Sequence, residues 1–227
     1  MKYLHIITLT LSFWFLQGCW DSNVSKDTQI GSRYAFTYDI DNEGWIGSFT
    51  DYRRYEESIY ALKFSHATLP QPLNTADGAV LQSGINRGER LFMYMVRRID
   101  GLDVNRTYDV SIDVEFAAHT DDGANQEVTL KAGATGFEPK RYVDARGFYR
   151  LNVDKGDQSG SGNDMQALGR LSNGSDNGGY RLQHLSNRTP LRVSADENGT
   201  MWVIVGTDSG IDAGTTIYYN TVTVSLE

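Results

Sequence analysis

Alternation of apolar and polar residues is the dominant pattern of the chain from about residue 33 onward. The clearest segment runs from Tyr108 to Phe116, where every second residue is apolar and the residues between are three acids and a serine. A period of two places alternate side chains on opposite faces of a strand, so one face of this strand should be buried and the other solvated. Shorter segments predict further strands at 34–40, 60–64, 91–96, 128–132, 149–153, 191–195, 201–205 and 218–226.

Local signals between these segments predict how some of them connect. Asn198-Gly199 predicts a two-residue hairpin turn between 191–195 and 201–205, because both residues accept a positive φ. Asn220 interrupts the apolar face of the last segment, which predicts a β-bulge or a polar contact at a sheet edge. Helical periodicity is confined to a turn or two around 165–171. The sequence therefore predicts an all-β fold, a two-sheet antiparallel β-sandwich of jelly-roll type with at most one or two short helices.

The first residues have the pattern of an export signal. Lys2 precedes an apolar run over 3–16 that is too short to span a bilayer. The tetrad Leu16-Gln17-Gly18-Cys19 resembles the lipobox of bacterial lipoproteins. The resemblance implies a signal peptide at 1–18, cleavage before Cys19, and acylation of Cys19 that anchors the protein in a membrane. The alternative is an ordinary signal peptide with a cysteine at its cleavage site. Trp20 in place of aspartate favours the outer membrane, in a cell that has two.

The rest of the chain is organised as a tether and one domain. Residues 19–32 are polar and aperiodic, which predicts an acylated cysteine followed by a flexible tether, and 33–227 contain no second linker. Cys19 is the only cysteine, so no disulfide can form within the chain. After loss of the signal, 20 basic residues face 29 acidic ones. That balance argues against nucleic acid and anionic lipid as partners.

Three segments resemble carbohydrate-binding-module-like jelly rolls, the galactose-binding-like sandwiches. Residues 101–108 have the pattern GL-x-x-N-x-x-Y before a strand, 218–224 are similar to the last strand of that family, and 36–45 look like its first strand and loop. The resemblance implies sugar binding on a concave face or at loop tips, and a structural calcium where the first and last strands meet. The implied calcium ligands are Asp39, Asp41 and Asn220, although an acid usually occupies the place of Asn220. The alternative is that 39–43 form a solvated turn.

Aromatic residues at predicted loop positions are candidates for a sugar-binding surface, because sugar rings stack on flat side chains. One group lies between the first two strands and a second at 142–148, and an arginine beside the buried strand at 91–96 is suited to an acidic sugar. The candidate ligand-binding residues are Trp45, Tyr52, Tyr55, Arg87, Tyr142 and Phe148. The alternative is that Trp45 and the tyrosines pack in the core or beneath the long loop, and that the arginine pairs with the excess carboxylates.

Catalytic signatures are few. His66, His119 and His184 are not spaced as a metal pair, and the chain has no Gly-x-Ser-x-Gly elbow and no phosphate-binding glycine loop. The sequence therefore predicts a lipid-anchored protein of the cell envelope with a non-catalytic, glycan-binding β-sandwich. One alternative is a structural or assembly lipoprotein that binds another envelope protein. Another is a polysaccharide-degrading enzyme whose two carboxylates meet only in the folded chain.

Overall fold

The computed structural model describes residues 32–88, 90–119, 123–172 and 178–227. The chain divides between residues 30 and 31, and the unit Gly31–Glu227 contains every described element. The predicted signal peptide, Cys19 and all of the predicted tether except Ser32 lie outside the described residues. Within the described part, no helix is long and apolar enough to cross a membrane.

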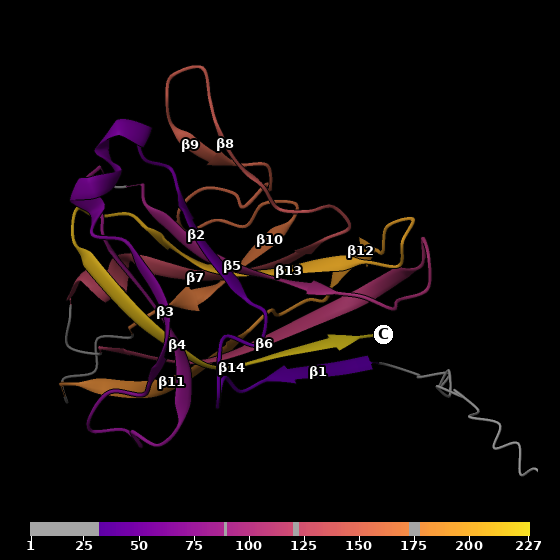
Figure 1. Ribbon diagram of the computed structural model, residues 1–227, viewed down its shortest axis with the longest axis horizontal. Coiled ribbons are helices and arrows are strands. Elements are labelled where there is room, and N and C mark those ends of the chain that lie inside the picture. The colour runs from indigo at the N-terminus through magenta and orange to yellow at the C-terminus, as the bar shows by residue number, and fades with distance from the viewer. Residues whose placement is uncertain (1–31, 89, 120–122, 173–177) are drawn as a thin grey trace, which may run out of the picture. The chain divides into compact units, whose positions relative to one another are not determined.

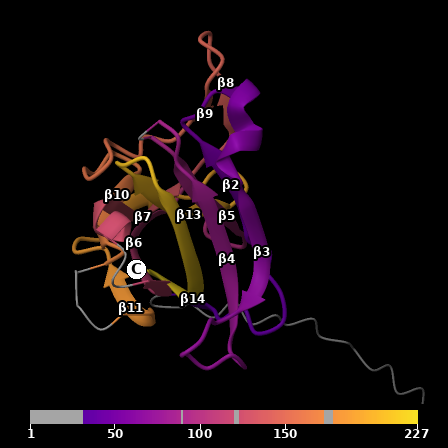
Figure 2. The same ribbon diagram turned by 90° about the vertical axis from the view of Figure 1, so that its left-hand side faces the viewer.

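Two antiparallel β-sheets packed face to face form this unit (Figures 1 and 2), so the predicted two-sheet sandwich is confirmed. The larger sheet has seven strands. Its order is β11 (Tyr180–Ser186), β6 (Thr107–His119), β14 (Gly214–Leu226), β4 (Gly78–Ile85) and β3 (Lys63–Thr68). Two short strands complete it: β1 (Ser32–Phe36) pairs with the end of β14, and β12 (Leu191–Ser194) pairs with the beginning of β6.

The second sheet has five strands and carries a small excursion. Its order is β10 (Met165–Arg170), β7 (Val128–Thr135), β13 (Met201–Ser209), β5 (Phe92–Ile99) and β2 (Ile46–Thr50). Residues 136–164, called the covering segment below, leave this sheet after β7 and return at β10. They include the hairpin of β8 (Arg141–Val143) and β9 (Tyr149–Leu151), which projects at the top of Figure 1. Short 3-10 helices are η1 (Arg54–Tyr60) and η2 (Gly123–Glu127).

The main core lies between the two sheets. The apolar face of β6 is buried as its alternation predicts, and Val110, Ile112, Val114 and Phe116 are all 0% exposed. The same face of β14 and the inner faces of β7 and β13 complete this core. Burial of each such side chain contributes roughly 1.5–3 kcal/mol, and no disulfide is needed to hold the sheets together.

The five-stranded sheet is buried on both faces. Every residue of β7 is buried, and so is every residue of β13 except the half-buried Trp202. A second apolar cluster on the outer face explains this burial, because Val153 of the covering segment and Met165 pack over Phe92, Tyr94 and Ile204. The covering segment therefore closes the outer face of this sheet.

The helical turn predicted around 165–171 is wrong, because Met165–Arg170 form strand β10. Met165, Leu168 and Leu171 are spaced by three, which imitates a helical period. In the structure Met165 packs in the outer cluster and Leu168 in the main core. An apolar residue on each face of a strand that is buried on both sides produces the same spacing.

The turn at Asn198-Gly199 is also not the predicted hairpin. Strand β12 pairs with β6, whereas β13 pairs with β5 and β7, so the turn carries the chain from one sheet to the other. Gly199 has a φ of +68°, and Asp196 holds the turn by accepting hydrogen bonds from the backbone N–H groups of Asn198 and Thr200, each at 2.8 Å. A side-chain cap thus replaces the symmetric hairpin turn.

Other boundaries differ from the sequence pattern for local reasons. The first strand ends at Phe36 because Tyr38 adopts a φ of +59°, which leaves Ile40 87% exposed. The β-bulge predicted at Asn220 is confirmed, since the register of β14 against β6 shifts between Tyr219 and Thr221. It lies inside the sheet, however, and not at the predicted edge.

Replacing Phe116 with alanine should lower the free energy of unfolding by about 3–5 kcal/mol, because the lost ring leaves a cavity in the closed core. Urea unfolding of the purified protein measures this change. The matched control is Phe137→Ala, because Phe137 is 46% exposed, and it should shift stability by roughly 0.5 kcal/mol or less. Equal losses for the two variants would contradict the assignment of the core.

Candidate functional site

A groove crosses the outer face of the seven-stranded sheet and has a cavity volume of about 510 Å³. We call it the sheet groove. Its walls and floor come from β1, β6, β11 and β14, together with the residue after β11. Its lining residues are Arg33, Ser111, Ile112, Asp113, His184, Ser186, Asn187, Thr223 and Ser225.

Strand register gathers these polar side chains from distant parts of the chain. Asp113 on β6 lies opposite Ser186 on β11 and Thr223 on β14. Ser111, two residues earlier and therefore on the same face, lies opposite Ser225. Two polar residues of the β6 alternation, Ser111 and Asp113, thus form the floor of the groove, with hydroxyl groups around one carboxylate.

Asp113 and His184 form the central polar pair of the groove. His184 Nε2 lies 2.5 Å from Asp113 Oδ1, and the two side chains are 58% and 41% exposed. A ligand in the groove can therefore reach both. Asn187 is positioned differently: its Oδ1 accepts a hydrogen bond from the Ile112 N–H at 2.6 Å and its Nδ2 donates to the Val110 carbonyl at 3.0 Å. Asn187 fixes the wall of the groove to β6.

An aromatic surface continues the same outer face along the strands. Tyr218 lies opposite Ala117, four residues from Asp113 on β6, a distance of about 13 Å at roughly 3.3 Å per residue. Its ring meets that of Tyr180 edge to face, with centroids 5.4 Å apart, and both residues are half-buried. The two tyrosines rest on a small apolar cluster that includes Leu69 and Ala117. The outer face therefore has a polar part and an aromatic part in line.

The charges of the sheet groove are mixed. Arg33 supplies one positive charge, Asp113 one negative charge, and His184 an imidazole. No single sign dominates, so this surface is suited to a ligand that is recognised mainly by neutral hydrogen-bonding groups.

Two of the aromatic residues predicted to bind a ligand are core residues, and that prediction is wrong for them. Trp45 is 2% exposed and packs edge to face against Phe36, with centroids 5.4 Å apart. Tyr52 is 1% exposed and packs against Tyr60 at 4.8 Å. Trp45 lies in the main core and Tyr52 in a separate buried cluster with Tyr60 and Leu91, so neither ring offers a face to a sugar.

Two other predicted residues do come together at the surface. The Arg53 guanidinium lies 5.8 Å from the ring centroid of Tyr55 and 5.0 Å from that of Phe148. Tyr55 is 72% exposed, and Tyr142 on the adjoining hairpin is 50% exposed. Arg87 is exposed in the turn between β4 and β5. The stack of Tyr55, Arg53 and Phe148 is a second surface, on the side of β2 and β9.

Each residue proposed as a calcium ligand makes a hydrogen bond through its side chain. Asp39 Oδ2 accepts a hydrogen bond from the Thr37 hydroxyl at 2.9 Å, and Asp41 Oδ1 accepts one from the Glu43 N–H at 2.6 Å. Asn220 Nδ2 donates to Glu115 Oε1 at 2.6 Å. Over the described ranges, no three or more His, Cys, Asp or Glu residues form a group that could hold a metal ion. The calcium site stays a prediction.

The sequence pattern indicated which residues of the β6 segment face solvent, but not which residues of other strands lie beside them in the sheet groove. The alternation over 108–116 marks Ser111 and Asp113 as solvent-facing. It does not indicate that His184 and Ser225 lie beside them, because those pairings join residues about 70 to 115 positions apart. His119, the last residue of β6, meets the ring of Tyr180 edge to face at 5.2 Å.

Comparisons with known proteins assign no family. No family model and no curated protein matches the chain. Among solved structures, it is similar to the K1 cleaved adhesin domain of Lys-gingipain from Porphyromonas gingivalis, with 13% identity, a TM-score of 0.40 and coverage of 85% of this chain and 97% of that one.

Two further similar structures are of a carbohydrate-binding module and a sugar-binding protein. A mannan-recognising carbohydrate-binding module has 9% identity, a TM-score of 0.39 and coverage of 87% of this chain and 98% of that one. A putative sugar-binding protein from Bacteroides thetaiotaomicron has 6% identity, a TM-score of 0.42 and coverage of 78% and 86%. These TM-scores lie below 0.5, so the likeness establishes neither a common family nor a common ligand.

Replacing Trp45 with alanine should lower the free energy of unfolding by about 3–5 kcal/mol, because the indole fills the closed end of the core. Thermal or urea unfolding measures the effect. The control Tyr55→Ala should change stability by roughly 0.5 kcal/mol, since that ring is mostly exposed. A Trp45→Ala protein of unchanged stability would show that the indole is not part of the core.

Proposed function

We propose that the protein is a non-catalytic, glycan-binding β-sandwich whose ligand lies along the outer face of the seven-stranded sheet. The proposal rests on one observation: the hydrogen-bonding groups of the sheet groove and the rings of Tyr180 and Tyr218 lie in line on a single open face. Sugars need both kinds of contact. Their hydroxyls donate and accept hydrogen bonds, and their C–H faces pack on aromatic rings.

The polar part of the face supplies complementary partners for sugar hydroxyls. The Asp113 carboxylate accepts hydrogen bonds from hydroxyl donors, while the Arg33 guanidinium donates to hydroxyl oxygens. Serine and threonine hydroxyls on either side do both. Because these groups stand on paired strands, their spacing is fixed before the ligand arrives, which reduces the entropic cost of binding.

The aromatic part lies about 13 Å from Asp113 along the strands, at roughly 3.3 Å per residue. A ligand that contacts both parts must be extended, so an oligosaccharide fits this face better than a single sugar does.

The proposal includes the membrane anchor. Acylation of Cys19 would hold the protein at a membrane, in the outer membrane if the cell has two, and residues 20–31 would connect the anchor to the sandwich. Two alternatives become outcomes of the tests below. In the first alternative, the partner is another envelope protein and not a glycan. In the second, the protein is an enzyme that releases sugar products from a polysaccharide.

Glycan binding should depend on Asp113. The full chain, applied to a glycan array with and without calcium, should bind at least one oligosaccharide, and Asp113→Asn should weaken that binding about 10- to 100-fold. The estimate follows from roughly 1.5–3 kcal/mol for a hydrogen bond to a charged group. Asp109→Asn is the matched control, because Asp109 lies on the same face of the same strand but outside the groove.

Three results would contradict the proposal. One is the absence of binding to every glycan under both conditions. Another is an equal loss of affinity for the Asp113 and Asp109 variants. The third is the release of shortened products from a bound polysaccharide, which would make the protein an enzyme.

Membrane association should depend on Cys19. Replacing Cys19 with serine removes the only thiol that can be acylated, so the protein should move from the membrane fraction to the soluble fraction after cell breakage. Metabolic labelling with a fatty acid measures the modification directly. Retention of Cys19→Ser in membranes, or labelling of that variant, would contradict the anchor.

A further inference from the structure

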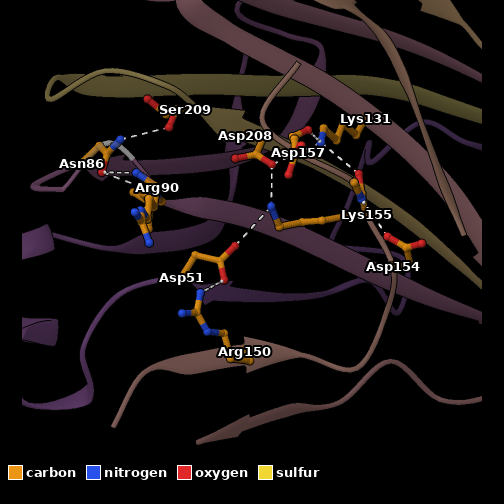
Figure 3. A network of polar contacts seen from close by, with 12 residues as sticks. Asp51, Asn86, Arg90, Lys131, Arg150, Asp154, Lys155, Asp157, Asp208 and Ser209 are labelled. Atoms are coloured by element: carbon orange, nitrogen blue, oxygen red, sulfur yellow. Dashed lines mark hydrogen bonds and ion pairs between the residues drawn. The ribbon is translucent and has the colours of Figure 1, made fainter. Parts of the chain in front are cut away.

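A buried group of charged side chains lies between the five-stranded sheet and the covering segment (Figure 3). The Lys131 side chain is 0% exposed and that of Asp208 is 1% exposed, and Lys131 Nζ lies 3.2 Å from Asp208 Oδ2. Lys155 Nζ lies 2.6 Å from the same oxygen and 3.2 Å from Asp51 Oδ2. Figure 3 shows Lys155 between Asp208 and Asp51, with Arg150 on the far side of Asp51.

Strand register places Lys131 and Asp208 beside each other. Lys131 on β7 lies opposite Gly206 on β13, and Asp208 lies opposite Thr129, so the two side chains are diagonal neighbours on one face. Gly206 has no side chain to separate them. A Cβ at that position would meet the Met93 carbonyl oxygen at 2.6 Å, so the sheet is too closely packed here for another residue.

Lys131 Nζ has three acceptors around it, the number that an ammonium group can satisfy. Its Nζ donates hydrogen bonds to the backbone carbonyls of Lys155, at 2.9 Å, and of Asp157. The third N–H group of the ammonium faces Asp208 Oδ2, so its proton can pass from Lys131 to Asp208. Asp208 Oδ1 is buried without a hydrogen-bond partner among the described residues, an unfavourable position for the oxygen of a carboxylate.

Burial disfavours the charged form of both groups. It lowers the pKa of Lys131, because desolvation disfavours the ammonium form more than Asp208 favours it. It raises the pKa of Asp208 in spite of the two neighbouring lysines. Transfer of one proton from the Lys131 ammonium to the Asp208 carboxylate is therefore easier here than in water, and it leaves a neutral amine beside a neutral carboxyl group, the reactant pair for an amide bond.

We propose that Lys131 Nζ and Asp208 Cγ become joined by an intramolecular isopeptide bond. The amine attacks Cγ, the C–O bond to Oδ2 breaks, and an amide and one water molecule are formed. One proton from Nζ leaves with the departing oxygen as part of that water, so atoms and charge balance and no oxidant is required. Lys131 Nζ lies 3.2 Å from Oδ2, which is bonded to Cγ, so the two reacting groups are held beside each other before the reaction.

Lys155 and Asp51 are positioned to assist this reaction. The Lys155 ammonium group donates to the departing oxygen at 2.6 Å and polarises the carboxyl group. Asp51 holds that ammonium group from its other side, at 3.2 Å. Removal of water from the site favours condensation, because the product water leaves a buried environment.

The remaining charges identify Lys131, and not Lys155, as the nucleophile. After Lys131 and Asp208 combine, Lys155 still pairs with Asp51, and Arg150 pairs with Asp51 at 2.8 Å and with Asp144 at 3.0 Å. If Lys155 reacted instead, Lys131 would lose the one carboxylate with which it pairs in the described part of the chain. A buried ammonium group without a counter-ion is strongly unfavourable.

Peptide mapping by tandem mass spectrometry tests the proposal on the purified full chain. After denaturation and tryptic digestion, the peptide that contains Lys131 should be joined to the one that contains Asp208, with a combined mass one water molecule below their sum. Lys131→Met should abolish the branched peptide. The matched control Lys140→Met, at a lysine whose side chain is 65% exposed, should retain it.

Several outcomes would overturn the proposal, and the first does not require any variant to fold. Recovery of the two peptides separately, at the masses given by their sequences, would show that the pair is only an ion pair. A branched peptide joined through Lys155 would show that the reacting lysine is not Lys131. Loss of water within a single unbranched peptide would indicate a different dehydration.

Discussion

Burial of both faces of the five-stranded sheet is the constraint on which the rest of the structure depends. Its inner face packs on the seven-stranded sheet, and its outer face lies beneath the covering segment. Ligand access to the faces of this sheet is therefore closed where Phe92, Tyr94 and Ile204 lie. The inner face of the seven-stranded sheet is likewise buried in the main core, but the polar part of its outer face remains open and forms the sheet groove.

Closure of the five-stranded sheet depends on how the charges beneath the covering segment are compensated. Unpaired, Lys131 or Asp208 would each cost several kcal/mol in that environment. The observed arrangement compensates them in a chain, with Lys155 shared between Asp208 and Asp51 and with Arg150 beyond. An amide between Lys131 and Asp208 would remove two of these charges and would also tie β7 to β13 in a chain whose only cysteine is Cys19.

The sequence predicts the class of fold well and the site poorly, for a physical reason. Alternation is a local property, so the strand from Tyr108 to Phe116 and its buried face could be predicted from the residues themselves. Partition of strands between two sheets is not local. The turn after β12 has the residues of a hairpin and yet connects the sheets, because Leu191 and Val193 face the core from the seven-stranded sheet.

Trp45 illustrates the same limit for single residues. An aromatic residue in a polar, glycine-rich loop suggests a binding surface, and only the fold decides that Phe36 and Tyr38 cover it. Tyr180 and Tyr218 are the converse case. Each lies in an ordinary strand, and pairing with β6 on its two sides brings their rings together on an open face.

The most direct measurement of the central claim is a chemical-shift map of the backbone amides, recorded while an array-selected oligosaccharide is added. Binding along the seven-stranded sheet predicts that the largest changes lie at Asp113, His184, Thr223 and Tyr218, on three paired strands. Changes confined to the stack of Arg53, Tyr55 and Phe148 would contradict this account and would place the ligand on the opposite sheet's loops instead.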